Sequence, residues 1–179
     1  LQQYAIMAGA YGSAVAGIEN PRVGILSIGE EDAKGTDIVK EARALMRDEP
    51  LINFVGNVEG RDVFKGVVDV VVCDGFVGNI ILKFTEGMTA GLFQTIMAEL
   101  QAHGGEEAVV GFKPVMKKVY GKLDWQEYGG APLLGVGGYC LICHGASEAR
   151  AIKNTVRVGQ QLFKSGVNQK IVDRIAASV

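Results

Sequence analysis

Short apolar runs alternate with helical patterns along the chain, and each run ends in a turn rich in glycine and polar residues. Residues 23–28 and 68–73 are nearly continuous apolar runs of strand length, and residues 53–56 form a shorter one. Such runs are typical of parallel strands that are covered on both faces. Because helical patterns separate them, the sequence predicts an α/β fold with a mainly parallel sheet. A chain of 179 residues is long enough to build this as a single domain.

Apolar residues recur at helical spacing between and after these runs. This spacing predicts helices over residues 1–18, 36–47, 79–100 and 168–177, another helix after residue 147, and weak helical character over residues 106–120. Residues 139–143 are expected to form the last strand. Thr36 or Asp37 is expected to cap the second helix.

Charge and cysteine content narrow the class of protein. Eighteen basic and twenty acidic residues give a net charge of −2, so no nucleic-acid partner is expected, since such binding needs a basic surface. Three cysteines exclude a disulfide framework and indicate a cytoplasmic protein. Cys140 and Cys143 form a C-x-x-C pair, which allows a redox or zinc interpretation. Their apolar surroundings favour two buried structural cysteines that point to opposite faces of a strand.

Two long uncharged stretches, residues 1–18 and 128–147, contain too many glycines and polar residues to cross a bilayer as helices. The chain shows no signal-peptide pattern. It enters a helical pattern at its first residues without a cap, which suggests a chain cut from a longer protein.

Ligands of parallel α/β sheets bind where the strands end and the chain turns into the following helix. Four such turns are expected here, over residues 29–35, 57–62, 74–79 and 144–147. Polar residues and glycines concentrate in them. The sequence therefore predicts a binding site that these four turns share.

The turn at residues 74–79 contains Asp74, Gly75, Gly78 and Asn79. Two glycines at a helix N-terminus expose backbone N–H groups, which favours an anion. The Asn79 amide is placed to donate to an oxyanion without adding charge. An ordinary strand-to-helix turn, with Asn79 as the helix cap, explains the same residues equally well.

The turn at residues 29–35 begins with Gly29 and holds one lysine, Lys34. A lysine just before a helix N-terminus is disfavoured by the helix dipole, and an anionic ligand removes that conflict. Lys34 is therefore expected to contact phosphate or an oxyanion. The acids of this turn, Glu30, Glu31 and Asp32, suit a divalent metal or simply a solvated loop.

The other two turns supply further candidates for the site. Asn57, Glu59 and Arg61 place an amide, an acid and a guanidinium together, either for a ligand or with Arg61 paired to a neighbouring acid. His144, followed by Gly145, is placed for acid–base work or for a structural hydrogen bond. No serine or cysteine nucleophile set can be assembled.

One stretch is strongly basic on a chain of slightly negative charge. Residues 112–122 contain Lys113, Lys117, Lys118 and Lys122 without an acid. Such a stretch suits an acidic partner protein or lipid headgroups, or is a solvated face.

Four segments together resemble the PlsX family of acyl-acyl-carrier-protein:phosphate acyltransferases. They are residues 21–35 with PRVG, IGEE and KG, residues 54–62 with FVGNVEGRD, residues 69–79 with DVVVCDGFVGN, and residues 128–135 with YGGAPLLG followed by His144 and Gly145. The resemblance covers the chain but only the C-terminal half of that family. It implies a Rossmann-like three-layer α/β/α fold related to phosphotransacetylases and isocitrate-type dehydrogenases.

The resemblance also implies a reaction, in which acyl-carrier protein and inorganic phosphate give acyl phosphate and free carrier. It implies no metal and no cofactor, a homodimer, and peripheral association with the membrane surface. The functional lysine and asparagine of the family fall on Lys34 and Asn79. Gly137 and Ala146 depart from the residues usual in the family, which puts any ligand role of those two positions in doubt.

An apolar channel for the acyl chain is expected from Phe76 and Val77 of the turn and from one face of the following helix, with Leu92, Phe93, Ile96 and Met97. Two other functions stay open on the sequence. One is a metal-dependent dehydrogenase on the same fold, using Glu30, Glu31 and Asp32. The other is a non-catalytic fragment that serves as a folding or dimerisation module.

Overall fold

The computed structural model describes residues 1–178, apart from the side chains of Lys122, Leu123 and Trp125. The chain divides into two compact units. The sheet unit consists of Leu1–Asp74, Pro132–Ile142 and Arg157–Val179, and the hairpin unit of Gly75–Ala131 and Cys143–Val156. The expectation of a single domain stays a prediction.

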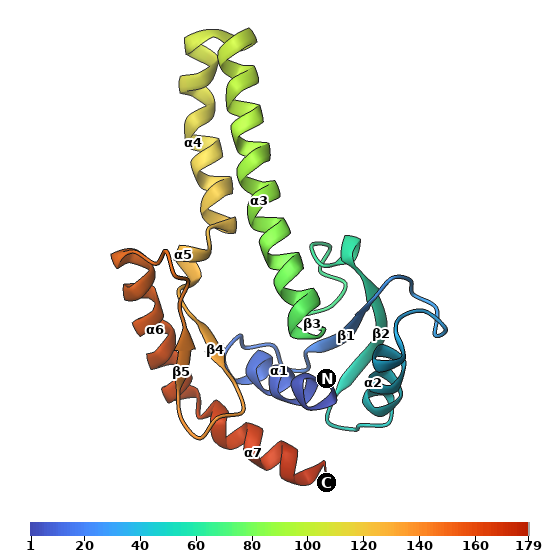
Figure 1. Ribbon diagram of the computed structural model, residues 1–179. Coiled ribbons are helices and arrows are strands. Elements are labelled where there is room, and N and C mark those ends of the chain that lie inside the picture. Colours follow the sequence, from blue (N-terminus) through green and yellow to red (C-terminus); the bar gives the residue numbers. More distant parts are fainter. Residues whose placement is uncertain (179) are drawn as a thin grey trace. The chain divides into compact units, whose positions relative to one another are not determined.

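The sheet unit is built on three parallel strands (Figure 1). β1 (Arg22–Ser27) lies in the centre, between β2 (Asn53–Glu59) and β3 (Val70–Val72). Both pairings are parallel, and the register of β1 with β2 shifts after Val23, which marks a bulge. The predicted α/β fold with a parallel sheet is confirmed, and the architecture is consistent with a Rossmann-like fold.

Two helices cover the sheet and close its core. α1 (Gln2–Ala14) and α2 (Asp37–Arg47) pack against the central strand, in one cluster of buried residues: Ala5, Ile6, Val23, Ile25, Ala42, Met46, Ile52 and Val72. Ile6 and Ile25 are fully buried, and each such side chain stabilises the fold by about 1.5–3 kcal/mol. This core fixes the strands at whose ends three of the predicted turns lie, those at residues 29–35, 57–62 and 74–79.

The second cluster lies on the other side of α1. There Ala10 packs against α7 (Val167–Ala177) and the last part of α6 (Ala149–Ser165), around Leu162, Val167 and Ile171. α1 is thus buried between the sheet and the C-terminal helices. It ends four residues before the predicted end, because Gly17 turns the chain with a φ of 72°.

α2 begins where the sequence predicts. The side chain of Thr36 accepts a hydrogen bond from the backbone N–H of Val39, which caps the helix. Asp37 in the first turn and Arg47 in the last turn both complement the helix dipole. The cap prediction is confirmed for Thr36.

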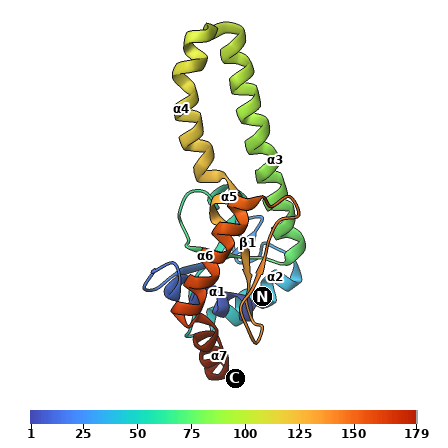
Figure 2. The same ribbon diagram turned by 90° about the vertical axis from the view of Figure 1, so that its left-hand side faces the viewer.

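The hairpin unit is helical. α3 (Gly75–Glu99) continues through a short π-helix, η2 (Leu100–Gly104), into α4 (Gly105–Leu123), and α5 (Trp125–Tyr128) follows. α3 and α4 lie side by side and run in opposite directions (Figures 1 and 2). α4 is a full helix rather than the weakly helical segment expected. Among the described residues, no helix combines the length and the apolar character that a membrane span needs.

Two short strands form a sheet of their own. β4 (Ala131–Leu133) pairs with β5 (Cys140–Ile142), separately from the parallel sheet. The expectation that the last strand and its turn at residues 144–147 belong to the parallel sheet is therefore wrong. Cys140 is exposed rather than buried, while Cys143 is half-buried and lies 3.4 Å from the Thr155 hydroxyl.

Candidate functional site

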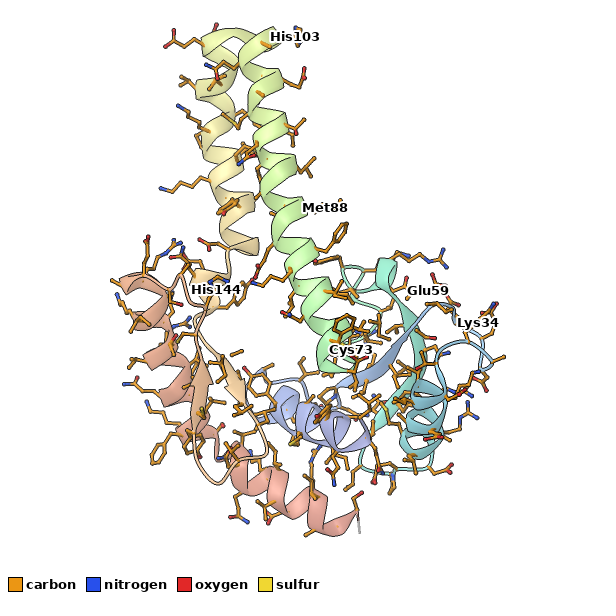
Figure 3. The ribbon with its side chains drawn as sticks, viewed as in Figure 1. Lys34, Glu59, Cys73, Met88, His103 and His144 are labelled. Atoms are coloured by element: carbon orange, nitrogen blue, oxygen red, sulfur yellow. The ribbon has the colours of Figure 1, made fainter. Side chains whose placement is uncertain are left out.

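The loop that follows β1 carries Lys34 at the carboxyl end of the strand, near Glu59 at the end of β2 (Figure 3). The lysine side chain is exposed, and its aliphatic stem folds back over Gly29, where a β-carbon would meet it at 2.8 Å. A side chain at position 29 would therefore displace the side chains of Lys34 and Glu31. Gly35 has a φ of 100°, a conformation that favours glycine. Together the two glycines place an exposed ammonium at the edge of the sheet.

Asn57 holds this loop in place. Its side-chain amide donates to the carbonyl oxygens of Gly29 at 3.2 Å and Glu31 at 2.9 Å. The residue lies within β2, which extends three residues further than predicted, so residues 57–59 are strand and not turn. Asn57 shapes the Lys34 loop through the amide that was expected to meet a ligand.

Glu59 and Arg61 pair with one another. The guanidinium lies 2.9 Å from a Glu59 carboxylate oxygen, and 4.0 Å from Glu30. Asp62, at the end of the 3-10 helix η1 (Gly60–Asp62), accepts from the Glu59 backbone N–H and from Lys65. The Lys65 ammonium is the main reason that the pKa of Asp62 lies below its usual range. Of the two interpretations of Arg61, the structure shows the pairing with a neighbouring acid.

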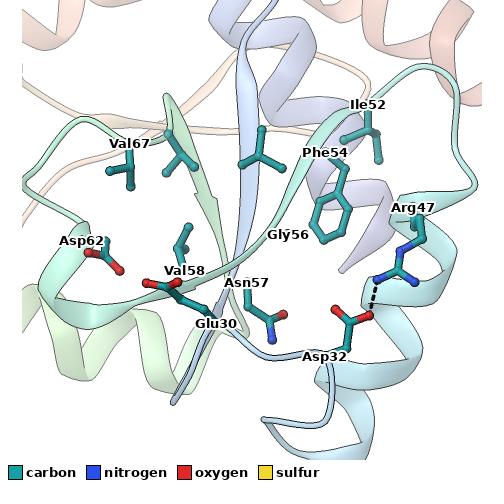
Figure 4. Close-up of a pocket in the computed structure, with 12 residues that line it drawn as sticks. Glu30, Asp32, Arg47, Ile52, Phe54, Gly56, Asn57, Val58, Asp62 and Val67 are labelled. Atoms are coloured by element: carbon teal, nitrogen blue, oxygen red, sulfur yellow. Dashed lines mark hydrogen bonds and ion pairs between the residues drawn. The ribbon is translucent and has the colours of Figure 1, made fainter.

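A cavity of about 640 Å³ lies beside β2, lined by Glu30, Asp32, Arg47, Asn57, Asp62 and apolar residues of the strand (Figure 4). Its carboxylates disfavour a phosphate group. The one guanidinium that lines it, Arg47, is bound to Asp32 at 2.8 Å, and this hydrogen bond lowers the pKa of Asp32. Arg43 also pairs with Asp32.

The pairing of Asp32 with arginines also concerns the alternative function of a metal-dependent dehydrogenase. Asp32 is engaged by two arginines, and Glu30 faces Arg61. Within residues 1–178, no group of three or more acidic, histidine or cysteine side chains is arranged to hold a metal ion. The three acids of this loop therefore do not form a cluster of metal ligands.

α3 begins at Gly75, four residues earlier than predicted. Gly75 and Gly78 thus belong to its first turn, and Asp74 directly precedes it, at the position of an N-cap. Asn79 lies inside the helix, so the interpretation of Asn79 as the cap is wrong. Its side chain is exposed, and its amide is available to a ligand.

Cys73 directly follows β3 and lies two residues before α3 (Figure 3). The thiol is half-buried, and burial, with a further contribution from Asp74, raises its pKa. A protonated thiol is a poor nucleophile. A raised pKa lowers the share of reactive thiolate at neutral pH.

His144 lies in the hairpin unit, on the exposed turn that precedes α6 (Figure 3). Its Nε2 atom is 3.1 Å from the Nζ atom of Lys83, and its Nδ1 atom is 3.1 Å from the backbone nitrogen of Ala146. Sequence reasoning missed Lys83. The available signal was its spacing of four residues from Asn79, which places both side chains on one side of α3.

The predicted site residues divide between the two units. Gly29, Lys34, Asn57, Glu59, Arg61 and Asp74 belong to the sheet unit, and Gly75, Gly78, Asn79, His144 and Gly145 to the hairpin unit. Within the first, the structure brings the Lys34 loop, Asn57 and Glu59 to neighbouring strand ends. Lys34 and Asn79 belong to different units, so their joint action on one ligand stays a prediction.

The residues expected to form an acyl channel separate in the structure. Phe93 and Met97 line a cavity of about 470 Å³ with Met116 and Tyr120 of α4. Charged residues line it as well: Lys117, Asp124, Glu127 and Arg150. The rings of Phe93 and Tyr120 pack edge to face, with centroids 5.2 Å apart. Phe76 and Leu92, by contrast, are exposed. This cavity of the hairpin unit thus contains only part of the predicted set, in a lining that also carries charge.

Comparison with known proteins identifies the family of the chain. The family model described as "Fatty acid synthesis protein" matches residues 1–170. A Phosphate acyltransferase of Dictyoglomus turgidum is 45% identical over 97% of this chain and 52% of its own length. One from Heliobacterium modesticaldum is 48% identical over 98% of this chain and 51% of its own.

A third Phosphate acyltransferase, from Halothermothrix orenii, is 48% identical over all of this chain and 53% of its own length. The chain thus spans about half the length of the curated relatives that it matches. The matched range includes both the Lys34 loop and the start of α3 with Asn79. This chain belongs to the fatty acid synthesis protein family, the PlsX family.

Proposed function

We propose that this chain is part of an enzyme that transfers a fatty acyl group from acyl-carrier protein to inorganic phosphate, which gives acyl phosphate for phospholipid synthesis. One observation carries the proposal: along nearly its whole length, the chain matches relatives named Phosphate acyltransferase. The exposed ammonium of Lys34 and the exposed amide of Asn79 supply the donor groups that such a reaction uses.

In the proposed reaction, an oxygen of hydrogen phosphate forms a bond to the thioester carbonyl carbon and the carbon–sulfur bond breaks. The proton of the phosphate ends on the thiol of the carrier. Phosphate is itself a nucleophile, so no serine or cysteine is needed. The contributions of the protein are to position the reactants and to stabilise the charge that develops on the carbonyl oxygen.

Each site residue has a role in this proposal. Lys34 holds the phosphate or the developing oxyanion, and Asn79 orients it with the first turn of α3, where Gly75 and Gly78 lie. In this proposal, His144 moves the proton between phosphate and the leaving sulfur. Asn57 acts by holding the loop that carries Lys34.

The proposed partners are acyl-carrier protein, inorganic phosphate, a second copy of the chain and a membrane surface. α3 supports the last two, because none of its residues is buried and Ile80, Phe84 and Met88 are all more than half exposed. Apolar surface of this kind is normally covered by a partner. The proposal includes no metal and no cofactor, and it places the protein in the cytoplasm.

The test is an activity measurement in a chimera, in which this chain replaces the matching segment of the Halothermothrix orenii relative. The chimera is mixed with acyl-carrier protein bearing a fatty acyl group and with inorganic phosphate. We expect acyl phosphate, trapped with hydroxylamine, to appear in equal amount to the free thiol of the carrier. Release of free fatty acid without acyl phosphate, or a rate independent of phosphate, would refute the proposal.

A further inference from the structure

Thr155 of α6 joins two segments of the hairpin unit that are distant in the sequence. Its hydroxyl oxygen accepts a hydrogen bond from the backbone N–H of Gly130 at 2.7 Å and donates to the carbonyl of Ala151 at 2.8 Å. The Sγ atom of Cys143 lies 3.4 Å from the same oxygen. One hydroxyl thus connects α6 both to the glycine-rich segment that contains Gly130 and to the residue that directly precedes His144.

The proton count of this hydroxyl defines the role of the cysteine. A hydroxyl has one proton to donate and two lone pairs that accept. The carbonyl of Ala151 only accepts, so the Thr155 proton points to it, and the backbone N–H of Gly130 occupies one lone pair. The thiol of Cys143 therefore donates to the second lone pair. This role requires the protonated thiol, whereas a zinc ligand or a nucleophile is a thiolate.

Backbone packing holds the glycine-rich segment against the same turn of α6. Gly129 has a φ of 79°, and a β-carbon there would lie 2.6 Å from the backbone nitrogen of Thr155 and 2.7 Å from the carbonyl carbon of Asn154. A side chain does not fit so close an approach. The Asn154 amide also donates to the carbonyl of Gln126 at 2.9 Å. α6 is thus fixed on this segment, and the Thr155 hydroxyl extends the contact to Cys143.

We propose that Thr155 is a positioning residue for His144. The hydroxyl fixes Cys143, and the next peptide bond leads to the exposed turn on which His144 lies (Figure 3). The inference rests on the proposed function, in which His144 moves a proton. Proton transfer requires heavy atoms within about 2.6–3.2 Å of each other, and a displacement of about 1 Å can lower a rate about 10²-fold.

The position of the imidazole is testable without catalysis, by NMR of the 179-residue chain with ring-labelled histidine. The chain has two histidines, and His103→Gln assigns the signals of each. Thr155→Val removes the hydroxyl but keeps the shape of the side chain. We expect it to shift the ring signals of His144 and to leave those of His103, in η2, unchanged. Thr155→Ser keeps the hydroxyl and should leave both sets of signals in place.

Thr95→Val is the matched control. Thr95 donates to the carbonyl of Gly91, four residues earlier in α3, at 2.9 Å, which is the same kind of bond that Thr155 makes within α6. The control variant loses this intrahelical bond and should shift neither set of histidine signals. Two variants of Cys143 test the other end of the contact, so the test does not depend on the folding of Thr155→Val. Cys143→Ala should move the ring signals further than Cys143→Ser, which keeps a donor.

The same variants are then compared in the chimera. We expect Thr155→Val to lower kcat about tenfold with KM for phosphate unchanged, because the proton-transfer group is displaced while the phosphate contacts remain. Thr155→Ser should restore most of the rate, and Thr95→Val should leave it unchanged. A role of Thr155 in stability alone would lower the melting temperature without changing kcat, and normal kcat in Thr155→Val overturns the inference.

The NMR result separates this inference from the proposed function. Unchanged His144 signals in folded Thr155→Val, or equal shifts in Cys143→Ala and Cys143→Ser, overturn the inference whatever the chimera does. A chimera without transferase activity refutes the proposed function. His144 signals that respond as expected would then still uphold the placement of the imidazole by Thr155.

Discussion

Lys34 and Asn79 are the residues whose exposed polar groups carry the proposed chemistry. Both side chains should act on the same developing charge. Removing either one should therefore lower turnover strongly, and the effects of the two substitutions should not be independent. We predict that Lys34→Ala and Asn79→Ala, made separately in the chimera, each lower kcat about 10²–10³-fold. The double variant should lose less than the product of the two effects. Steady-state kinetics with acyl-carrier protein measures both.

The position of Asn79 inside α3 gives this prediction a stability control. Alanine is a better helix former than asparagine, so Asn79→Ala should leave the melting temperature unchanged or raise it slightly. A capping residue would instead lose about 1 kcal/mol. Normal turnover in both single variants would exclude the proposed roles.

Gly35 sets the conformation of the chain just after Lys34. Its φ of 100° is strained for any other residue, and a β-carbon there would lie 2.8 Å from Val39 and 3.0 Å from Ser27. We predict that Gly35→Ala lowers the free energy of unfolding by about 1–3 kcal/mol. Gly60→Ala is the control, because Gly60 has ordinary backbone angles and open space around it. Chemical denaturation compares the two, and equal losses would contradict the prediction.

Residue types and turn positions were sufficient to predict Lys34, Asn79 and His144 as candidates. They were insufficient to predict what each side chain contacts. Asn57 was expected to bind a ligand, but the backbone carbonyls of a neighbouring loop take its amide. Lys83 escaped prediction because its contact with His144 joins residues 61 positions apart, which no local pattern encodes.

The pairing of Arg22 with Asp69 joins β1 to the start of β3. Two guanidinium nitrogens lie 3.0 Å from the two carboxylate oxygens, and the Arg22 backbone N–H donates to the same acid. These hydrogen bonds, those from the Arg22 side chain most of all, lower the pKa of Asp69 to about 2. In the unfolded chain the pKa returns to about 4.

A lowered pKa stabilises the folded state above the unfolded pKa and loses that effect as pH falls toward the folded value. We predict that the unchanged chain loses stability between about pH 4 and pH 2, in part through Asp69. The Asp69→Asn variant should lack this pH-dependent contribution. It should be less stable than the unchanged chain at pH 7, and the difference in stability between the two should become smaller at low pH. Melting temperatures over this pH range measure it, and a constant gap would contradict the assignment.

The lysines of α4 form the other charged element. Lys113, Lys117 and Lys118 are exposed, while the side chain of Lys122 lies outside the described residues. We predict that Lys117→Glu with Lys118→Glu slows binding of acyl-carrier protein or weakens binding to anionic vesicles, most strongly at low salt. Lys153→Glu with Lys164→Glu changes the charge equally on α6 and is the control. Unchanged binding of both ligands at low salt would make these lysines a solvated face.

Elements with strong local signals were predictable, and elements that depend on distant partners were not. The strand at residues 22–27 and the Thr36 cap follow from apolar runs and capping chemistry. The start of α3 was placed too late, because Gly75 and Gly78 suggest a loop by composition. The pairing of β4 with β5 could not be predicted from the local sequence, since each strand has only three residues.

For the whole molecule, the chain spans about half the length of the curated relatives that it matches. The sheet unit has its own buried core, so we expect the chain to fold. Lys34 and Asn79, however, are both exposed to solvent. Donors stabilise an oxyanion most strongly where water is excluded. The remaining part of the relatives is therefore expected to complete the site.

We predict that the 179-residue chain alone folds but releases no acyl phosphate above background, whereas the chimera does. Circular dichroism with thermal melting checks that the chain is folded under the assay conditions, and hydroxylamine trapping measures the product of both proteins. Because the same residues are present in each, the difference reports only on what surrounds them. Turnover by the chain alone at a rate close to that of the chimera would show that its own residues exclude enough water to stabilise the oxyanion.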